Sequence, residues 1–499
     1  MTKSKTIFVI LSLLALVSCG CDNKRTLPET DGTFERYTQD LVMHSEIMGT
    51  DIMYSVLLPA SYVAEKDRKY PVVFMLHGLG DTHNSWNGKY LTANQKIKSL
   101  EASGKISDMI YVFPEGFSTY YCNYYTGKYN YMDMFIDEFV PHVDANYRTI
   151  PDREHRSISG YSMGGFGAMV LAEKHPETFL CSAPLSMSFR TDQQYMAESQ
   201  SGWDGQWGKI FGGVGQPGYG RITDYYKQHC PFYQFTQENK ATLSKVNWFF
   251  TCGDDEEQLL IANDTLHVQL RSLGYEHEFR VGNGGHSSSY WMDALGEVLP
   301  YFDHHMNGGT AWPESSWETY ALQDVTFDGN GAAPSKAYTS AEPGTGVYFF
   351  HNGMDPQQLK DVMSALYSTN TKFLFVFLPC DLTKKSVAEW ITYYEGVYPQ
   401  NSRFAVSLNN SGETVLANEA SFSTMIFIDT ALGKDIKANP EKKYLFACTD
   451  NSDCYADMGA LYRSCKRNGA DFEYRVINAT NDSDILRCAN KLKTYIPFI

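Results

Sequence analysis

A serine between two glycines is the residue of this 499-residue chain whose setting most directly suggests nucleophilic chemistry. Ser162 lies in the run Gly160-Tyr161-Ser162-Met163-Gly164. The strand-like run Ser157 to Ser159 precedes it, and the helical run Gly165 to Ala172 follows. Glycines at these places permit the strained strand-to-helix turn that lifts a serine hydroxyl above a sheet. The sequence therefore predicts that Ser162 attacks a carbonyl carbon, as in the cleavage of an ester.

A serine hydroxyl needs a base to take its proton, and the best placed histidine is His286. It lies in the Gly-rich run Asn283-Gly284-Gly285-His286-Ser287, directly after the predicted strand Phe279 to Val281. In this kind of site the chain order is serine, acid, histidine, so a base late in the sequence is expected. A histidine on such a loop can reach over the edge of the sheet to the serine.

The acid that orients the histidine is expected in the loop after the predicted strand that ends at Cys252. One carboxylate there would accept the imidazole N–H, fix the tautomer and stabilise the imidazolium. Asp255 is the first choice and Glu256 the alternative, whereas the neighbouring Asp254 and Glu257 are expected to be solvated charges.

Two backbone N–H groups are expected to stabilise the oxyanion that forms when the serine attacks. One belongs to Met163, directly after the nucleophile. The other is expected from Leu79, in the loop His77-Gly78-Leu79-Gly80-Asp81 after a second buried strand. His77 is interpreted as a residue that braces this loop, not as a second base.

These residues need a scaffold, and residues 34–307 alternate short strands with helices. Continuous apolar runs such as Val72 to Leu76 are typical of strands buried on both faces of a mostly parallel sheet. Other strand candidates are Tyr54 to Pro59, Met109 to Phe113, Ser157 to Ser159 and Trp248 to Thr251; helical candidates are Met132 to Tyr147 and Phe166 to His175. The alternation predicts an α/β fold with helices on both faces of the sheet, and the turn at Ser162 specifies the α/β-hydrolase fold.

Several blocks of the sequence resemble the family named "putative esterase", which includes feruloyl and acetyl-xylan esterases (carbohydrate esterase family one), S-formylglutathione hydrolase (esterase D) and the mycolyltransferases. The segment Tyr147 to Arg156 that runs into Gly160 to Ala168 is similar to the family, as are Leu76-His77-Gly78 and Gly284-Gly285-His286 with Tyr290-Trp291. The resemblance implies a Ser-His-Asp/Glu triad and an acyl-enzyme, with no cofactor and no metal. One departure concerns the acid loop, where Gly253 and Leu259-Leu260 are one residue further apart than is usual.

Aromatic residues near the predicted site suggest what the acyl or sugar group is. Tyr124 lies in a Tyr-rich loop ahead of the serine, and Trp207 and Trp291 lie in segments expected to roof the site. Flat rings suit sugar faces and phenolic acids. Together with the expected lipid attachment, the family resemblance implies that the substrate is a feruloyl or acetyl ester on a plant polysaccharide such as xylan. Alternatives are an acyltransferase or a thioesterase like S-formylglutathione hydrolase with the same triad, and a carbohydrate-binding surface lipoprotein without activity.

The C-terminal part, residues 346–499, resembles a degenerate copy of the first, after a Gly- and Pro-rich linker at 308–345. Trp248 to Cys252 matches Tyr444 to Cys448, and Glu278-Phe279-Arg280-Val281 matches Glu473-Tyr474-Arg475-Val476. Asn409 then falls where the serine belongs, and the run Asn478-Ala479-Thr480-Asn481 places asparagine at the base position. Asparagine cannot take up a proton at neutral pH, so this part is expected to be catalytically silent, with Ser411 as a displaced nucleophile the competing interpretation.

The N-terminus predicts export. Residues 1–18 have a basic start and a short apolar run typical of a signal peptide, and Leu16-Val17-Ser18-Cys19 resembles a lipobox in which Cys19 is lipidated. Residues 19–33 are then a polar tether, and the protein is expected in the bacterial cell envelope, at the outer membrane or cell surface, with the lipid as its only membrane contact. The net charge of -16 argues against a nucleic-acid partner.

Overall fold

The computed structural model describes residues 35–308, 326–327, 336–339, 344–351, 373–379, 384–397, 399–408, 411–433 and 436–478. The expected signal peptide, tether and Cys19, and most of the linker at 308–345, lie outside these ranges. The chain from Arg36 to Ile499 forms one compact unit. The boundary expected at the linker 308–345 therefore stays a prediction. In the described part of the chain, no helix combines the length and the hydropathy needed to cross a membrane.

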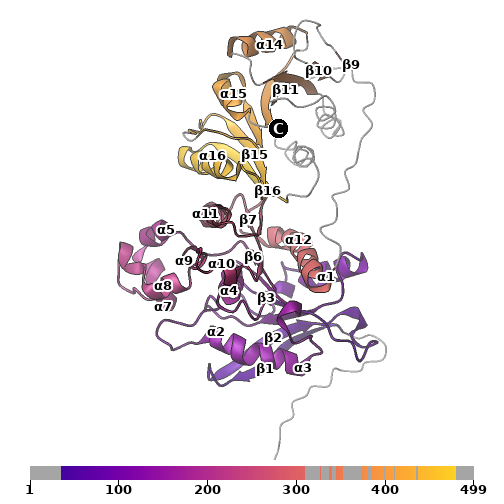
Figure 1. The fold of residues 1–499 in the computed structure, drawn as a ribbon, viewed down its shortest axis with the longest axis vertical. Helices are drawn as coiled ribbons and strands as arrows, with labels where there is room; N and C mark the ends of the chain where they lie inside the picture. The colour runs from indigo at the N-terminus through magenta and orange to yellow at the C-terminus, as the bar shows by residue number, and fades with distance from the viewer. Residues whose placement is uncertain are drawn as a thin grey trace, which may run out of the picture. The chain divides into compact units, whose positions relative to one another are not determined.

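Eight strands, here called the first strand group, form a mostly parallel sheet. Their bounds are β1 Tyr37–Ser45, β2 Thr50–Leu57, β3 Val72–Leu76, β4 Ile110–Pro114, β5 Arg156–Tyr161, β6 Cys181–Leu185, β7 Asn247–Gly253 and β8 Glu278–Gly282. They lie in the order β1-β2-β4-β3-β5-β6-β7-β8. β1 is antiparallel to β2 and β2 to β4, whereas the neighbours from β4 to β8 are parallel. The α/β-hydrolase-like fold expected from the sequence is therefore confirmed (Figure 1).

Helices cover both faces of this sheet. Their bounds are α1 Ala93–Ala102, α2 Tyr131–Met134, α3 Val140–Asn146, α4 Met163–Lys174, α5 Asp192–Ala197, α6 Gln200–Gly202, α7 Gly208–Phe211, α8 Asp224–Gln228, α9 Pro231–Gln234, α10 Lys240–Leu243, α11 Glu257–Leu273 and α12 Ser288–Asn307. α1 and α12 lie on one face, while α4 and α11 lie on the other (Figure 1). The helices α5 to α10 form an insert between β6 and β7.

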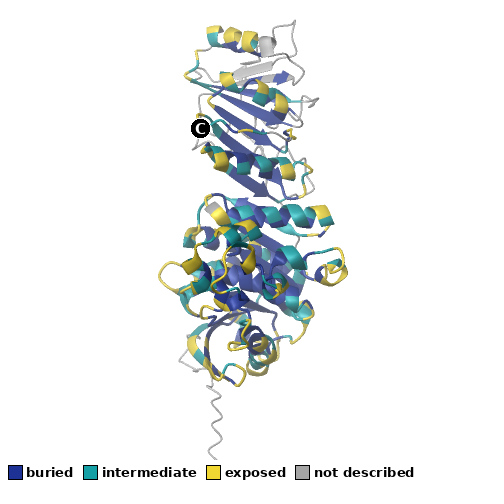
Figure 2. Ribbon diagram, turned by 90° about the vertical axis from the view of Figure 1, so that its left-hand side faces the viewer, coloured by how far each residue is buried: buried dark blue, intermediate teal, exposed yellow. Residues whose placement is uncertain are grey.

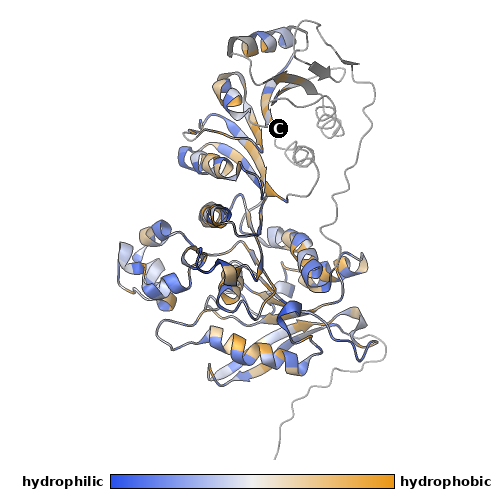
Figure 3. Cartoon of the chain, in the orientation of Figure 1, coloured by the Kyte–Doolittle hydropathy of each residue, from blue (hydrophilic) through white to orange (hydrophobic). Residues whose placement is uncertain are grey.

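The strand β3 shows why the central strands are apolar along their whole length. All five of its residues are buried. Val73 and Met75 belong to the core shared with α1 and α12, whereas the ring of Phe74 packs edge-on against Phe135, 5.4 Å away between centroids. Both faces of the strand are thus covered, and burial of this apolar surface is the main stabilising contribution. Figure 2 shows the central strands of the first strand group as buried, and Figure 3 shows that they are mostly hydrophobic while the helices mix both kinds of residue.

Eight further strands, here called the second strand group, continue the same sheet. Their bounds are β9 Thr326–Phe327, β10 Lys336–Thr339, β11 Thr345–His351, β12 Phe373–Pro379, β13 Ser402–Leu408, β14 Thr424–Ile428, β15 Lys443–Thr449 and β16 Asp471–Ile477, with helices α14 Lys384–Val397, α15 Gly412–Ala417 and α16 Tyr455–Asn468. Their order, from β9 inward, is β9-β10-β12-β11-β13-β14-β15-β16. The first strand group has the same order, with β9 to β16 in the places of β1 to β8. The pairs involving β9 and β10 are antiparallel and the others are parallel, again as in the first strand group.

The junction of β5 and α4 depends on glycines because backbones approach very closely there. A Cβ atom on Gly160 would lie 2.4 Å from the carbonyl oxygen of Gly164. A Cβ atom on Gly164 would in turn lie 2.4 Å from the carbonyl oxygen of Leu76, at the end of β3. Helix α4 can therefore reach the sheet at this point only with glycine at both positions.

We predict that Gly164→Ala lowers the free energy of unfolding by about 1–3 kcal/mol, because the added methyl must displace backbone atoms. Thermal or urea unfolding of the purified full-length protein measures the change. Gly296→Ala in α12 is the control, because its Cβ would meet only the flexible end of Lys96 at 3.5 Å, and alanine is the better helix former. A Gly164→Ala protein as stable as the Gly296→Ala protein would contradict the close packing described here.

Candidate active site

Ser162 occupies the turn between β5 and α4 in a conformation that is costly for a residue with a side chain. Its φ is 56° and its ψ is -115°, outside the regions that L-residues normally occupy. Three backbone hydrogen bonds hold it there: its N–H donates to Leu185 at 2.9 Å, and its carbonyl accepts from Phe166 at 3.1 Å and Ser188 at 3.0 Å. The strained turn is thus fixed by both the preceding sheet and the following helix.

His286 meets the serine from the loop after β8. Its Nε2 lies 2.9 Å from the Ser162 Oγ, and its side chain is 38% exposed, so the pair is open to solvent. Ser287 directly follows and caps α12 by accepting the N–H of Tyr290. The cap fixes where the loop ends and the helix begins, so the position of His286 is set from its C-terminal side.

Glu256, not Asp255, is the carboxylate that contacts the histidine. Its Oε2 lies 2.8 Å from Nδ1 of His286. Its side chain is fully buried, and its Oε1 accepts hydrogen bonds from the N–H of Gly253, at 2.8 Å, and from the Ser186 hydroxyl. A buried carboxylate whose oxygens are all hydrogen-bonded is held in one orientation.

This geometry corrects the first choice of acid. The Asp255 side chain is exposed, and its backbone N–H donates to the carbonyl of Gly284 at 3.1 Å. The turn therefore directs residue 255 outward and residue 256 inward. The hydrogen bond of the Asp255 N–H to Gly284 fixes this turn, which is the physical reason that the alternative, Glu256, faces His286.

Asp254 also departs from expectation, because it is buried and not solvated. It is 1% exposed, its Oδ1 accepts the N–H of Gly284 at 3.1 Å, and its Oδ2 forms an ion pair with Arg475. Burial raises the pKa of this carboxyl, and the Arg475 guanidinium opposes that rise. The side chain of Glu257 lies outside the described part of the structure.

The two N–H groups expected to stabilise an oxyanion lie on segments that meet at the serine. Met163 is the first residue of α4, and Leu79 lies in the turn after β3. Gly164 of α4 lies close to the carbonyl groups of Leu76 and His77, which lead into this turn. Neither the Met163 nor the Leu79 N–H donates a hydrogen bond to another described residue. Their joint role stays a prediction. His77 braces the loop as expected: it is buried, its Nε2 accepts the N–H of Gly116 at 2.8 Å, and its carbonyl accepts the Tyr121 hydroxyl.

The three aromatic residues expected to contact substrate have different environments. Tyr124 lines an open cleft of about 410 Å³ together with Leu79, Gln206 and Lys209. Trp207 is 2% exposed and packs inside the helical insert, 4.4 Å from Tyr120 between ring centroids. Burial argues against direct contact between Trp207 and a substrate, and its place is that of a core residue.

Trp291 lies behind the histidine. Its ring is 9% exposed, stacks on Tyr161 at 4.3 Å and meets the His286 ring edge-on at 5.0 Å. Its Nε1–H donates to the Ser186 hydroxyl at 2.9 Å, and that hydroxyl donates to Glu256. The indole therefore supports both the base and the acid.

Ser186 is a site residue that the sequence analysis did not single out. It follows β6 with a φ of 47°, and its N–H donates to Thr251 at 2.7 Å. This conformation aims its hydroxyl between Trp291 and Glu256. A lone serine after a strand carries no signal of its own, so only the three-dimensional contact identifies it.

Ser411, the possible displaced nucleophile of the second strand group, is not placed as Ser162 is. It is 1% exposed, with its Oγ 2.8 Å from the carbonyl oxygen of Phe350 and 2.8 Å from the Ser407 hydroxyl. A hydroxyl so enclosed has no access to a substrate. Asn409 and Asn481 lie outside the described residues.

The strand order, the strained serine turn and the Ser162–His286–Glu256 hydrogen bonds together define an α/β-hydrolase. The chain belongs to the esterase family described as "Putative esterase", whose model matches residues 45–302.

The chain is also similar to individual proteins. The chain is 30% identical over 295 residues to an endo-1,4-beta-xylanase/feruloyl esterase of Xylanibacter ruminicola, covering 56% of this chain and 34% of that protein. It is 28% identical over 251 residues to esterase MT1326 of Mycobacterium tuberculosis, covering 46% of this chain and 52% of that protein. A solved structure of a ferulic acid esterase is 29% identical, with 54% of this chain and 98% of that chain covered and a TM-score of 0.46. The chain thus spans about a third to a half of the length of these curated relatives.

We predict that Glu256→Gln lowers kcat roughly a thousandfold or more toward a soluble ester such as p-nitrophenyl acetate. The amide can donate to Nδ1 and favour the wrong tautomer, and it cannot stabilise an imidazolium. Asp255→Asn is the matched control, since it removes a neighbouring exposed charge, and its kcat should stay within about twofold of wild type, as expected for an exposed side chain. Equal losses in the two variants would contradict the placement of the acid.

Proposed function

We propose that this protein is a serine carboxylic ester hydrolase that acts through an acyl-enzyme. The observation that carries the proposal is a continuous chain of hydrogen bonds, from the Ser162 Oγ to Nε2 of His286 and from Nδ1 of His286 to the buried Glu256. In this proposal Ser162 is the nucleophile, His286 the general base and then acid, and Glu256 the group that orients the imidazole.

The proposed chemistry follows from these two hydrogen bonds. His286 Nε2 accepts the Ser162 proton as Oγ bonds to the ester carbonyl carbon, and the carbonyl oxygen becomes an oxyanion. The N–H groups of Met163 and Leu79 are proposed to bind that oxyanion. The imidazolium then protonates the leaving alcohol as the C–O bond breaks, and water repeats the sequence on the acyl-enzyme to release the acid. No step of this scheme requires a cofactor.

We further propose that the substrate is a feruloyl or acetyl ester on a plant polysaccharide such as xylan. The printed name of the Xylanibacter relative combines a xylanase with a feruloyl esterase. The cleft lined by Tyr124 and Leu79 offers an aromatic ring beside the proposed oxyanion loop, which suits a phenolic acyl group or a sugar face. A signal peptide at 1–18 and lipidation at Cys19 would place the enzyme at the cell envelope, where such polymers are met.

The second strand group is proposed to be a catalytically silent copy of the first. Besides the shared strand order, equivalent backbone features recur. Ser186 after β6 and Asp429 after β14 both have positive φ, 47° and 41°. Their N–H groups donate to the fifth residue of the next strand, Thr251 and Ala447, at 2.7 and 3.0 Å. Asp429 thus stands where the first strand group has the serine that holds Glu256.

We predict that Ser162→Ala reduces turnover of acetyl, feruloyl and thioester substrates by at least a thousandfold, because the remaining groups supply only binding and oxyanion stabilisation. Release of acetate, ferulate or thiol is followed for the wild type and the variant. Ser272→Ala, an exposed serine of α11, is the control. Retained turnover in Ser162→Ala would refute the proposed mechanism, and wild-type activity confined to thioesters would refute the polysaccharide substrate.

We predict that Tyr124→Ala raises KM for a feruloylated xylo-oligosaccharide about tenfold and leaves KM for p-nitrophenyl acetate nearly unchanged, because only the larger substrate reaches this ring. Steady-state kinetics with both substrates test this. Tyr90→Ala, which removes a 71% exposed tyrosine outside the cleft lining, should change neither constant. Equal effects on both substrates would contradict a contact of Tyr124 that is specific to the larger substrate.

A further inference from the structure

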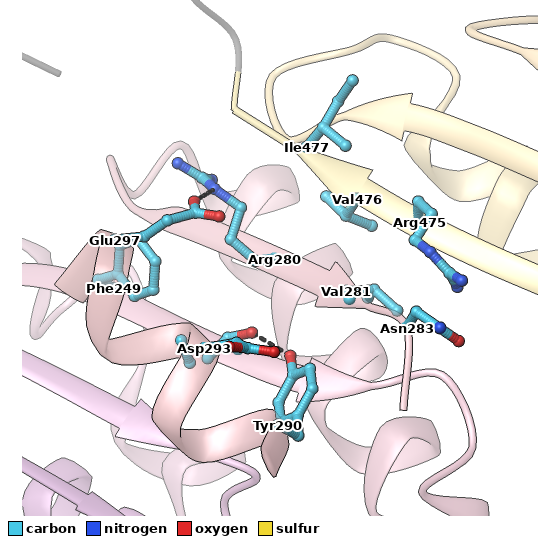
Figure 4. Close-up of a pocket in the computed structure, with 13 residues that line it drawn as sticks. Phe249, Arg280, Val281, Asn283, Tyr290, Asp293, Glu297, Arg475, Val476 and Ile477 are labelled. Atoms are coloured by element: carbon cyan, nitrogen blue, oxygen red, sulfur yellow. Dashed lines mark hydrogen bonds and ion pairs between the residues drawn. The ribbon is translucent and has the colours of Figure 1, made fainter. Parts of the chain in front are cut away.

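The two strand groups meet through one antiparallel pair of edge strands, β8 and β16. Val281 of β8 is paired with Val476 of β16, and these two valines hold equivalent places in the matching runs Glu278 to Val281 and Glu473 to Val476. Figure 4 shows them at the junction, with Arg280 to one side and Arg475 to the other. When equivalent residues pair with one another, the contact is isologous, as at the two-fold axis of a homodimer.

Two ion pairs repeat this symmetry. Arg280 of β8 contacts Asp450 at 2.6 Å, and Arg475 of β16 contacts Asp254. The two aspartates are equivalent, since each directly follows its strand, β7 or β15, and each N–H donates to the next edge strand, at Gly282 or Ile477. All four charged groups are buried. Arg280 of the first strand group therefore lies beside the turn after β15, and Arg475 of the second lies beside the turn after β7.

The consequence differs on the two sides, because only one of these turns carries the proposed active site. Asp254 lies two residues before Glu256, and its Oδ1 accepts the N–H of Gly284, two residues before His286. Its Oδ2 accepts from Arg475 and from the N–H of Tyr474 at 3.1 Å. One carboxylate thus connects the acid turn, the histidine loop and β16.

Helix α11, which begins directly after Glu256, is also held from the second strand group. Asp264 of α11 is 0% exposed, and Arg463 of α16 donates to its Oδ2 at 2.8 Å. The hydroxyl of Tyr474 donates to its Oδ1 at 3.1 Å. The segment that carries the acid is therefore fixed at its start and along its length by side chains from beyond residue 460.

We propose that Arg475 is a positioning residue for the proposed hydrolysis, acting through Asp254 to set the distance between Glu256 and His286. This inference rests on the proposed function. It means that the second strand group, although silent itself, helps to position the catalytic residues of the first. Without the guanidinium, Asp254 is left as a buried carboxylate lacking its ion-pair partner, a costly state. The turn must then rearrange, and both the acid and the histidine loop move with it.

The test compares the two symmetry-related ion pairs in the full-length protein. Arg475→Gln should lower kcat for p-nitrophenyl acetate roughly ten- to a hundredfold with little change in KM, because small displacements of catalytic groups act on kcat. Asp450→Asn instead breaks the symmetry-related ion pair with Arg280, beside the turn of the silent strand group. It should lower the melting temperature by a similar amount and keep kcat within about twofold, because the turn it loosens carries none of the proposed catalytic groups.

Arg475→Lys provides a second measurement should Arg475→Gln not fold. The Arg475 guanidinium contacts both Asp254 and, at 2.7 Å, Glu473. A lysine keeps the charge but has no planar fork to contact both carboxylates at once, so an intermediate kcat is expected. Wild-type kcat in the Arg475 variants that fold, or an equal loss of kcat in Asp450→Asn, would overturn the inference. Ser162→Ala is assayed alongside: if it stays active, the proposed function fails, whereas an inactive Ser162→Ala beside fully active Arg475 variants refutes only the positioning role.

Discussion

The buried carboxylate of Glu256 is the interaction on which the geometry of the site depends. Its two oxygens bring together the end of β7 at Gly253, the residue after β6 at Ser186 and the loop after β8 at His286. A carboxylate out of contact with water is stable only when such partners are present. The strands and their turns must therefore enclose this carboxylate for the histidine to face Ser162, so the site depends on a complete fold around Glu256.

Much of the first strand group could be predicted from the sequence, for reasons that particular residues make clear. Val72 to Leu76 is apolar throughout because helices cover both of its faces, and Ser162 is recognisable because only glycines permit the contacts at 160 and 164. His286 could be found because a Gly-rich loop after a strand is a local signal. These features are encoded by neighbours in sequence.

The acid, the supporting serine and the buried tryptophan could not be read in the same way. Which of two adjacent carboxylates turns inward depends on the backbone of the turn, where the N–H of Asp255 bonds to Gly284. Ser186 gains its role from a positive φ and from Trp291, which lies 105 residues away in sequence. The sequence predicts Trp207 in the roof of the site, yet the insert folds around it and buries it. In each case the deciding partner is distant in sequence, where pattern and propensity carry no information.

The antiparallel contact of β8 with β16 also bears on how far the outer strands of the two groups are exposed. The outer strand of a sheet presents unpaired N–H and carbonyl groups that invite pairing with other chains. Here the edge on the active-site side of one strand group lies against the matching edge of the other, with buried arginines on both sides of the pair. β8 and β16 thus each have a neighbour within their own chain, which leaves less of either strand open to pairing with another molecule.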